Sequence, residues 1–264
     1  MSDEEALLAA IIANPDEDTP RLVYADWLDE NGQPERAEFI RLQIRSANLP
    51  DSPEGLIVKQ RVMRLCDKYG VTWLEQLGLV RNEGRWVRGF VEHVTVTPEH
   101  LVSFLERLFR VTPVSSLEVL PGFVHGGPTA LPVLFELAEW PQLSRIRSLR
   151  LFRLPIGDQG IRALVESPFI SNLQALDLSR SILGDEGVTI IANSPHLKSL
   201  RSLCLFDHPL NVNDVLALAQ SPYFERIENL NLICTLDDSE PGYEEAVEAL
   251  TRRFGDRADV SVRD

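Results

Sequence analysis

A repeat of 27 residues constrains this chain more than any other feature of its sequence. Leucines recur at that spacing, and each of them opens a Leu-x-Leu pair. The first leucines of the four pairs are Leu149, Leu176, Leu203 and Leu230. A fixed period of this length is typical of repeat proteins, in which a unit buries its apolar face only against neighbouring units. The repeat therefore predicts a stack of units with one long surface, and it favours binding to a surface over catalysis in a cleft.

Each unit has the same internal order. Alternating apolar and polar residues predict a short strand at its start, and the apolar spacing then becomes helical. A Ser-Pro pair is expected to end each helix, because proline cannot continue one. These pairs stand at 167–168, 194–195 and 221–222. Asp158 and Asp185 are expected to cap the helices of their own units, and Asn213 or Asp214 the helix of the third unit.

Weaker units flank the regular ones. Further strands are expected at 94–96, 117–119 and 260–262, and further helices at 98–109 and 243–254. The sequence thus predicts an α/β fold with six or seven parallel strands and five or six helices on the outside. Atypical units at both ends are expected to act as caps of the stack.

The apolar frame Leu-x-x-Leu-x-Leu begins at Ile146, Leu173, Leu200 and Ile227. With this frame and a true helix in each unit, the chain resembles the leucine-rich repeat family in its ribonuclease-inhibitor-like class. The resemblance implies a right-handed β/α solenoid. The family usually places Asn or Cys three residues after the second strand leucine. This chain has Leu154, Ser181, His208 and Thr235 there, so the buried asparagine ladder is missing and the turns need other partners.

The first 80 residues show no such period. Ser2 and Glu5 form a predicted capping box that opens a helix through Ala13. Further helices are expected at 20–30, 34–47 and 54–69, with prolines near their starts. We therefore expect a small all-α cap at 1–80 and the leucine-rich-repeat solenoid at 81–264. The cap is expected to cover the open apolar end of the solenoid, with Trp27, Phe39 and Trp86 in the joint.

Within this region, residues 14–43 resemble the "repeat-companion" domain of planctomycete and myxobacterial proteins. The run reads NPDEDTPRLVYADWLDENGQPERAEFIRLQ, and Arg21, Tyr24, Arg36 and Gln43 are among its matching positions. Residues 86–91 resemble the usual junction between that domain and the repeats. The resemblance implies a head joined to a repeat array, and it assigns no mechanism.

Composition excludes several classes of protein. A net charge of −14 opposes binding to phosphate backbones, so nucleic acid is not expected as a partner. No apolar stretch reaches the roughly 18 residues of a membrane span, and the acidic start does not resemble a secretion signal. Cys66, Cys204 and Cys234 are odd in number and lack metal-ligand spacing, which favours a reducing cytoplasm.

No catalytic pattern stands out. The five histidines lie in different units, and none forms a close pair on one helix face. A Gly-x-Ser-x-Gly elbow and a phosphate loop are both missing from the sequence. We therefore expect no catalytic residue, no metal site and no cofactor, and a chain that is not an enzyme.

The predicted site is the concave face of the strands. One outward column is Glu118, Arg150, Asp177, Cys204 and Asn231, and a second, two residues on, is Leu120, Phe152, Ser179, Phe206 and Ile233. The second column is apolar in four of five units, so it predicts a nearly continuous apolar stripe on adjacent strands. The predicted partner-binding residues are Leu120, Arg150, Phe152, Arg153, Asp177, Arg180, Phe206, Asp207, Asn231 and Ile233. Alternatively, the stripe packs under neighbouring side chains or under the loop at 121–128.

These observations favour a cytoplasmic protein-recognition scaffold that binds a protein partner, without nucleic acid or membrane. One alternative is a regulator or inhibitor of an enzyme such as a GTPase, in which Arg153 or Arg180 would be presented to the enzyme. Another is a structural module of a larger assembly.

The strand register makes a direct prediction about stability. Leu176→Ala should lower the free energy of unfolding by about 2–5 kcal/mol, because it removes a buried leucine between two units. Arg180→Ala, at the rim, should change it by less than about 0.5 kcal/mol. Denaturant unfolding of both variants measures the difference. Equal losses would mean that the two faces of the strand are exchanged, as a slip of one residue would do.

Overall fold

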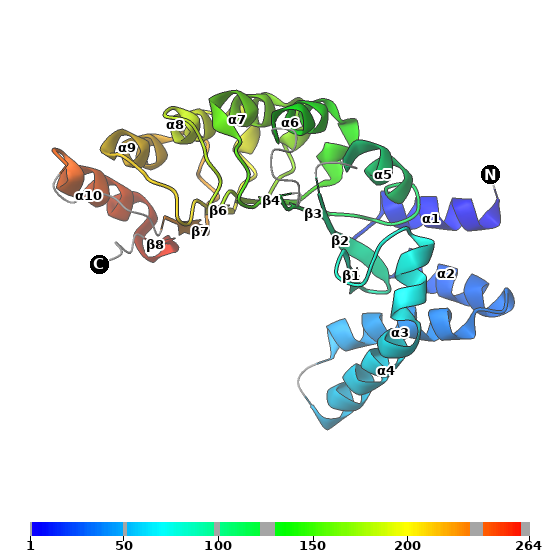
Figure 1. Ribbon diagram of the computed structural model, residues 1–264. Helices are drawn as coiled ribbons and strands as arrows, with labels where there is room; N and C mark the ends of the chain where they lie inside the picture. Colours follow the sequence, from blue (N-terminus) through cyan, green and yellow to red (C-terminus); the bar gives the residue numbers. More distant parts are fainter. Residues whose placement is uncertain (1, 50–51, 98–100, 122–129, 233–239, 260–264) are drawn as a thin grey trace. The chain divides into compact units, whose positions relative to one another are not determined.

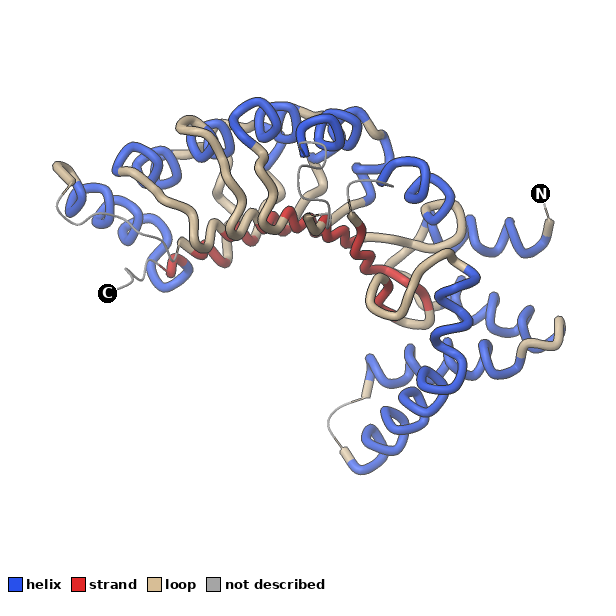
Figure 2. The backbone as a smooth tube through the Cα atoms, viewed as in Figure 1, coloured by secondary structure: helices blue, strands red, loops and turns tan. Residues whose placement is uncertain are grey.

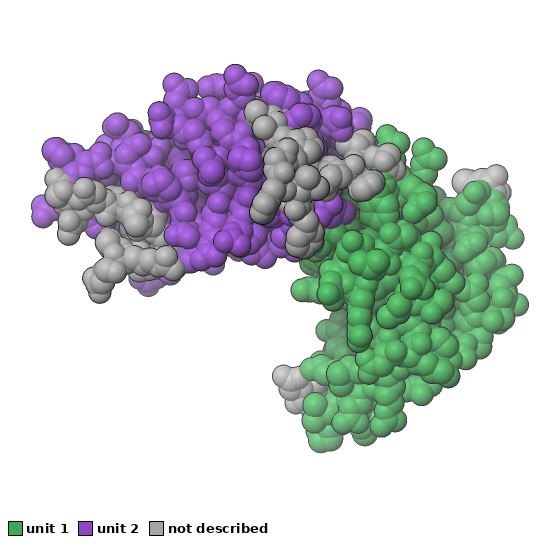
Figure 3. Space-filling view, in the orientation of Figure 1, with its two compact units in different colours: residues 1–95, 103–115 green, residues 96–102, 116–264 purple. Residues whose placement is uncertain are grey.

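The computed structural model describes residues 2–49, 52–97, 101–121, 130–232 and 240–259. The chain is an α/β protein whose sheet is open and has eight strands in the order β1 to β8. It forms two compact units (Figure 3): unit 1 is residues 1–95 and 103–115, and unit 2 is residues 96–102 and 116–264. Unit 1 therefore extends past the boundary that the sequence predicted at residue 80.

Unit 1 begins with four helices, which are α1 (Asp3–Ala13), α2 (Thr19–Glu30), α3 (Pro34–Asn48) and α4 (Pro53–Gln76). The capping box of Ser2 and Glu5 is confirmed, with both of its hydrogen bonds formed. Helix α4 continues well beyond its predicted end at residue 69. After it, β1 (Gly84–Val87) and β2 (Phe90–Val96) form an antiparallel hairpin, and α5 (Leu101–Leu108) follows. The sequence had predicted neither β1 nor its antiparallel pairing.

Three side chains from α2 and α3 hold the turn of this hairpin. Arg21 Nη1 donates hydrogen bonds of 3.3 Å to the carbonyl oxygens of Val87 and Arg88. Arg36 Nη2 donates to the carbonyl oxygen of Gly89, and the Gly89 N–H donates to Gln43 Oε1 at 2.7 Å. These three residues all lie in the run at 14–43. In this chain they fix the path of the backbone between β1 and β2.

The turn itself uses a strained backbone. Arg88 has φ 46° and Gly89 has φ 86°, a pair of positive values that matches a type I′ hairpin. An arginine is costly in this conformation, because its Cβ crowds the backbone. Its guanidinium, however, donates to the carbonyl oxygens of Pro15 at 2.6 Å and Asp16 at 2.8 Å. The same residue thus shapes the hairpin and ties it to the loop between α1 and α2.

Aromatic rings form much of the core of unit 1. Phe39 is fully buried, with ring centroids 5.1 Å from Trp73 and 5.6 Å from Trp86. Trp27 stacks on Tyr24 at 5.7 Å. The three aromatic residues that the sequence assigned to a joint with the repeats therefore all pack onto partners inside unit 1.

Unit 2 contains the regular repeats. Its strands are β3 (Ser116–Val119), β4 (Ser148–Leu151), β5 (Ala175–Asp177), β6 (Ser202–Cys204), β7 (Asn229–Asn231) and β8 (Ala258–Asp259). They pair in parallel and in sequence order, with Leu149, Leu176, Leu203 and Leu230 aligned. Both leucines of every pair are at most 1% exposed. The predicted register is confirmed, whereas the strand expected at 260–262 lies outside the described residues.

The helices of unit 2 lie on one side of its strands (Figures 1 and 2). They are α6 (Ala130–Glu139), α7 (Gly157–Glu166), α8 (Gly187–Ala192), α9 (Val212–Gln220) and α10 (Tyr243–Phe254). On the opposite side of β3 to β8, none of the described residues of unit 2 forms a helix (Figure 2). We call this side the open face.

The Ser-Pro pairs do more than end the helices. The buried hydroxyl of each serine donates to a backbone carbonyl near the end of the preceding unit's helix. The bonds join Ser167 to Ala138, Ser194 to Val165 and Ser221 to Ala192. At the next equivalent carbonyl, that of Ala219, the donor is Arg253 Nη1 at 2.7 Å. A ladder of side-chain bonds therefore links successive units, a role that the sequence analysis did not assign to these serines.

The turns after the strands lack asparagine but are still bonded. Ser181 Oγ donates to the carbonyl oxygen of Leu151 and accepts from the Leu154 N–H at 3.1 Å. His208, at the equivalent position of the next unit, is hydrogen-bonded to the backbone of Ser181. Burial lowers the pKa of His208, and the bond to Ser181 opposes that shift. Serine and histidine side chains thus hydrogen-bond the backbone of the preceding unit's turn.

The expected helix caps were wrong for Asp158 and Asp185. Neither α7 nor α8 has a side-chain cap, and Asp158 Oδ1 instead accepts from the Glu186 N–H of the next unit at 3.1 Å. In the third unit, Asn211 caps α9 and Asp214 completes the capping box. A carboxylate can therefore accept a hydrogen bond from a neighbouring unit rather than from its own helix, because stacking brings equivalent turns close together.

Gly89→Ala should be strongly destabilising. An added Cβ would lie 2.5 Å from Cγ1 and 2.8 Å from Cα of Ile40, and the φ of 86° is itself unfavourable for alanine. We expect a loss of about 2–5 kcal/mol, from strain and overpacking together. Gly157→Ala is the matched control, since its φ is 64° but nothing lies within 4 Å; its loss should be about 1–2 kcal/mol. Equal losses in denaturant unfolding would refute the close approach of Ile40.

Ser194→Ala tests the ladder between units. The variant leaves the carbonyl oxygen of Val165 without its donor in a buried place, which should cost about 1–3 kcal/mol. Ser144→Ala is the control, because that hydroxyl bonds within its own turn at an exposed site and its loss should change stability by less than about 0.5 kcal/mol. Thermal and denaturant unfolding measure both. If the two variants lose the same amount, the ladder is not a source of stability.

Candidate partner-binding face

The strand pairing brings the first predicted column into register. Glu118, Arg150, Asp177, Cys204 and Asn231 lie on adjacent strands as direct partners. Their side chains are exposed or half-buried, while the leucines beside them are buried. Side chains alternate across a strand, so this column projects from the open face as the sequence predicted.

An ion-pair network crosses three strands of the open face. Arg150 Nη1 lies 3.1 Å from Glu118 Oε1, and Arg150 Nε lies 3.0 Å from Asp177 Oδ2. The side chains of Arg150, Glu118 and Asp177 are 44%, 30% and 29% exposed. Pairs this exposed stabilise a fold by only about 0–1 kcal/mol, but they orient Arg150. Glu118 belongs to this network although the sequence analysis did not count it among the binding residues.

Asp177 is also anchored from its own strand. Its Oδ1 accepts from the backbone N–H of Ser179 at 2.9 Å and from the Ser179 hydroxyl. Ser179 Oγ in turn lies 3.2 Å from Cys204 Sγ. Cys204 projects from the open face with the rest of its column, and its thiol is half-buried in this polar group.

Arginine side chains cover the phenylalanines of the second column. The guanidinium carbon lies 4.9 Å from the Phe152 ring centroid for Arg150 and 5.7 Å for Arg153. Arg180 lies 5.6 Å from the ring centroid of Phe206. Leu120 and both phenylalanines are half-buried, Ser179 between them is 6% exposed, and Ile233 lies outside the described residues. The stripe is therefore a series of partly covered rings rather than a bare apolar strip.

The rim residues share an unusual backbone. Arg153, Arg180 and Asp207 occupy equivalent positions, with φ of 57°, 58° and 60°. This left-handed conformation normally favours glycine, and for other residues it costs roughly 1–2 kcal/mol each. Arg180 Nε pairs with Asp207 Oδ2 at 3.0 Å across neighbouring turns. The left-handed conformation therefore lowers stability at three turns, and these turns place charged side chains beside the phenylalanines.

Arg153 differs from the other arginines of this face. Its guanidinium rests on Phe152, and it has no carboxylate partner in the described part of the chain. Arg150 and Arg180, by contrast, are each held by acidic residues. The sequence selected all three arginines, and the carboxylate partners seen in the structure distinguish two of them from Arg153.

The described residues contain no group of three or more His, Cys, Asp or Glu that could hold a metal ion. Among these residues, no helix combines the length and the apolar character that crossing a membrane requires. Cys66 and Cys204 are free thiols. Comparison with protein-family models and with curated proteins finds no match to this chain.

Proposed function

We propose that this chain is a non-enzymatic recognition scaffold that binds a protein partner on the open face of unit 2. The observation that carries the proposal is the pair of arginine-covered phenylalanines, Phe152 and Phe206, on the open face beside the buried strand leucines. Arginine and aromatic residues are enriched at protein interfaces and among the residues that dominate binding energy. A polypeptide offering apolar side chains to the rings and acidic side chains to the guanidinium groups would match this face.

We also propose a more specific description of the fold. The 27-residue leucine frame and the strand-then-helix order support a right-handed leucine-rich-repeat solenoid of the ribonuclease-inhibitor-like class, whose concave side is the open face. The hydrogen bonds of Arg21, Arg36 and Gln43 to the hairpin support the repeat-companion assignment of unit 1. Rigid units joined by buried hydrogen bonds would lose little conformational entropy on binding.

Charge and cysteine chemistry guide the choice of partner and location. The net charge of −14 disfavours nucleic acid, and we propose neither a nucleic-acid nor a membrane partner. Free Cys66 and Cys204 support the cytoplasm as the expected compartment.

A regulator of an enzyme such as a GTPase is the second candidate. The observation that favours it is Arg153, an exposed residue at a strained turn that has no carboxylate partner among the described residues. Arg180 is less suited, because Asp207 already pairs with it. In this case Arg153 would be presented to the active site of the bound enzyme.

The test compares the full chain with two variants as bait in affinity purification. The double variant Phe152→Ser with Phe206→Ser removes both rings from the open face. Phe135→Ser is the matched control, since Phe135 is 44% exposed and lies on α6. We expect one stoichiometric protein to be captured by the parent chain and by the control, and its capture to fall at least tenfold with the double variant.

Melting curves of all three baits separate binding from folding. Unchanged capture by a folded double variant would place the partner site elsewhere. A large loss of melting temperature would show that the rings belong to the core. Capture of a nucleotide-hydrolysing enzyme whose rate changes with Arg153→Ala would favour the regulator.

A further inference from the structure

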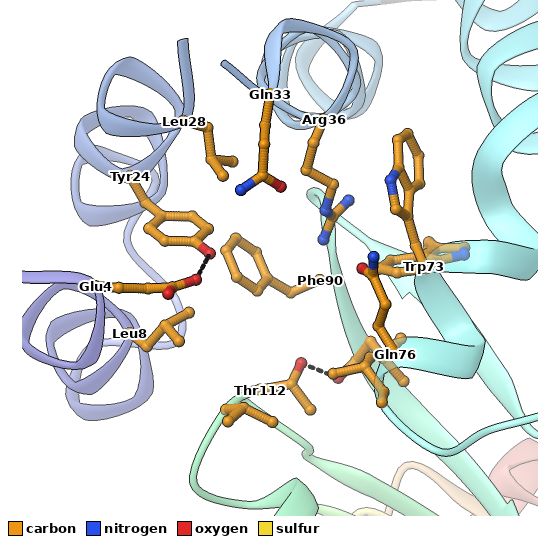
Figure 4. Close-up of a pocket in the computed structure, with 14 residues that line it drawn as sticks. Glu4, Leu8, Tyr24, Leu28, Gln33, Arg36, Trp73, Gln76, Phe90 and Thr112 are labelled. Atoms are coloured by element: carbon orange, nitrogen blue, oxygen red, sulfur yellow. Dashed lines mark hydrogen bonds between the residues drawn. The ribbon is translucent and has the colours of Figure 1, made fainter. Parts of the chain in front are cut away.

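Unit 1 contains a cavity of about 240 Å³. Residues of α1, α2, α3, α4, β1 and β2 line it, together with Val111 and Thr112. Figure 4 shows Glu4 and Arg36 reaching into this space from different helices, with Phe90 between them in the view. An apolar cavity of about 150 Å³ can bind benzene, so the space is large enough for a small organic molecule.

Arg36 lies in this cavity without a counter-ion. Among the described residues, its guanidinium makes one hydrogen bond, from Nη2 to the carbonyl oxygen of Gly89. Nη1 is buried, and no described residue accepts a hydrogen bond from it or pairs with the guanidinium as an acid. Four rings surround it instead, with Trp86 at 4.6 Å and Trp73 at 4.9 Å as the nearest. Burying a cation without a carboxylate is expensive, so this site holds an uncompensated positive charge.

Arg21 is a second arginine of unit 1 and differs from Arg36 in having a counter-ion. It is fully buried, and its Nη2 pairs with Glu92 Oε1 at 2.8 Å. Carbonyl oxygens of Pro15, Val87 and Arg88 accept its other bonds. The described part of the chain therefore supplies a carboxylate to Arg21 and none to Arg36, although both bind the same hairpin.

The lining of the cavity indicates what the rest of a negatively charged ligand would be like. Tyr24, Trp73, Trp86 and Phe90 are aromatic, and half of the other lining residues are aliphatic. The amides of Gln33 and Gln76 line the cavity and have no side-chain hydrogen bond in the structure, so they are available to orient a ligand. Glu4, which accepts from the Tyr24 hydroxyl at 3.0 Å, would repel an acid from its side of the cavity.

We infer that the cavity of unit 1 binds a small organic carboxylate with an apolar, planar body, whose acid group is neutralised by Arg36. The aromatic walls hold the body, and Glu4 sets its direction by keeping the acid group near Arg36. Burial lowers the pKa of Arg36 to about 10, so the guanidinium remains charged at neutral pH. Nη1 is buried, so a lining side chain must rotate before a ligand can form a direct hydrogen bond with it. The charge of the guanidinium can attract the acid group of a ligand without this movement.

Calorimetry and melting curves of the full chain test this with benzoate and its neutral analogue benzamide. Benzoate should bind at least tenfold more tightly than benzamide and raise the melting temperature. Gln76→Glu places a negative charge in the cavity and should weaken benzoate binding at least tenfold without weakening benzamide binding. Gln60→Glu is the matched control, since it adds the same charge to an exposed position of α4 outside the cavity; it should leave both affinities unchanged.

Gln33→Glu provides the same test from a second lining residue, should Gln76→Glu fail to fold. Equal affinity for benzoate and benzamide would overturn the inference, as would no binding of either. Benzoate binding that survives both cavity variants would place the anion elsewhere on the chain and overturn it too.

Discussion

Buried side chains that bond to the backbone are the interaction on which this fold depends. In unit 2, serine hydroxyls bind carbonyl oxygens at the ends of the preceding helices. A helix leaves its last carbonyl groups without an internal partner, and in a stack these ends lie between units, away from water. Each serine therefore meets a need that leucine packing cannot meet.

In unit 1, larger side chains form the hydrogen bonds to backbone groups. Its hairpin turn is bonded by Arg21, Arg36 and Gln43, which reach it from α2 and α3. The turn packs directly on α3, where a Cβ on Gly89 would lie 2.8 Å from Cα of Ile40, and side chains of α2 and α3 bond its carbonyl and N–H groups. The two units thus use the same kind of bond with different side chains.

Local patterns in the sequence predicted much of the fold. The 27-residue leucine frame determined the strand register of unit 2, and capping and proline signals located the first helices. The hairpin partner β1 was missed, since Gly84–Val87 is short and its pairing depends on a turn formed by an arginine with positive φ. The cap assigned to Asp158 was wrong because its acceptor role depends on the next unit, which local sequence does not contain.

The strand register of the open face was predictable from the sequence, but the contacts of its side chains were not. Alternation along the strands placed Arg150 and Asp177 on one face, where they are direct partners on adjacent strands. The covering of the rings by arginine depends on rotamers and on the left-handed turns at Arg153 and Arg180. The sequence does not show side-chain rotamers. It also does not mark the left-handed turns, because they lack the glycine that usually indicates such a conformation.

Arg253 has a consequence for how the sequence of this repeat can vary. The carbonyl oxygens of Ala219 and Ser221 accept from the guanidinium of Arg253, which reaches them from α10. The three earlier helix ends are bonded by the serine of a Ser-Pro pair instead. A unit can therefore lose its Ser-Pro signature and still bond the preceding helix, provided that another donor reaches the same carbonyl oxygen.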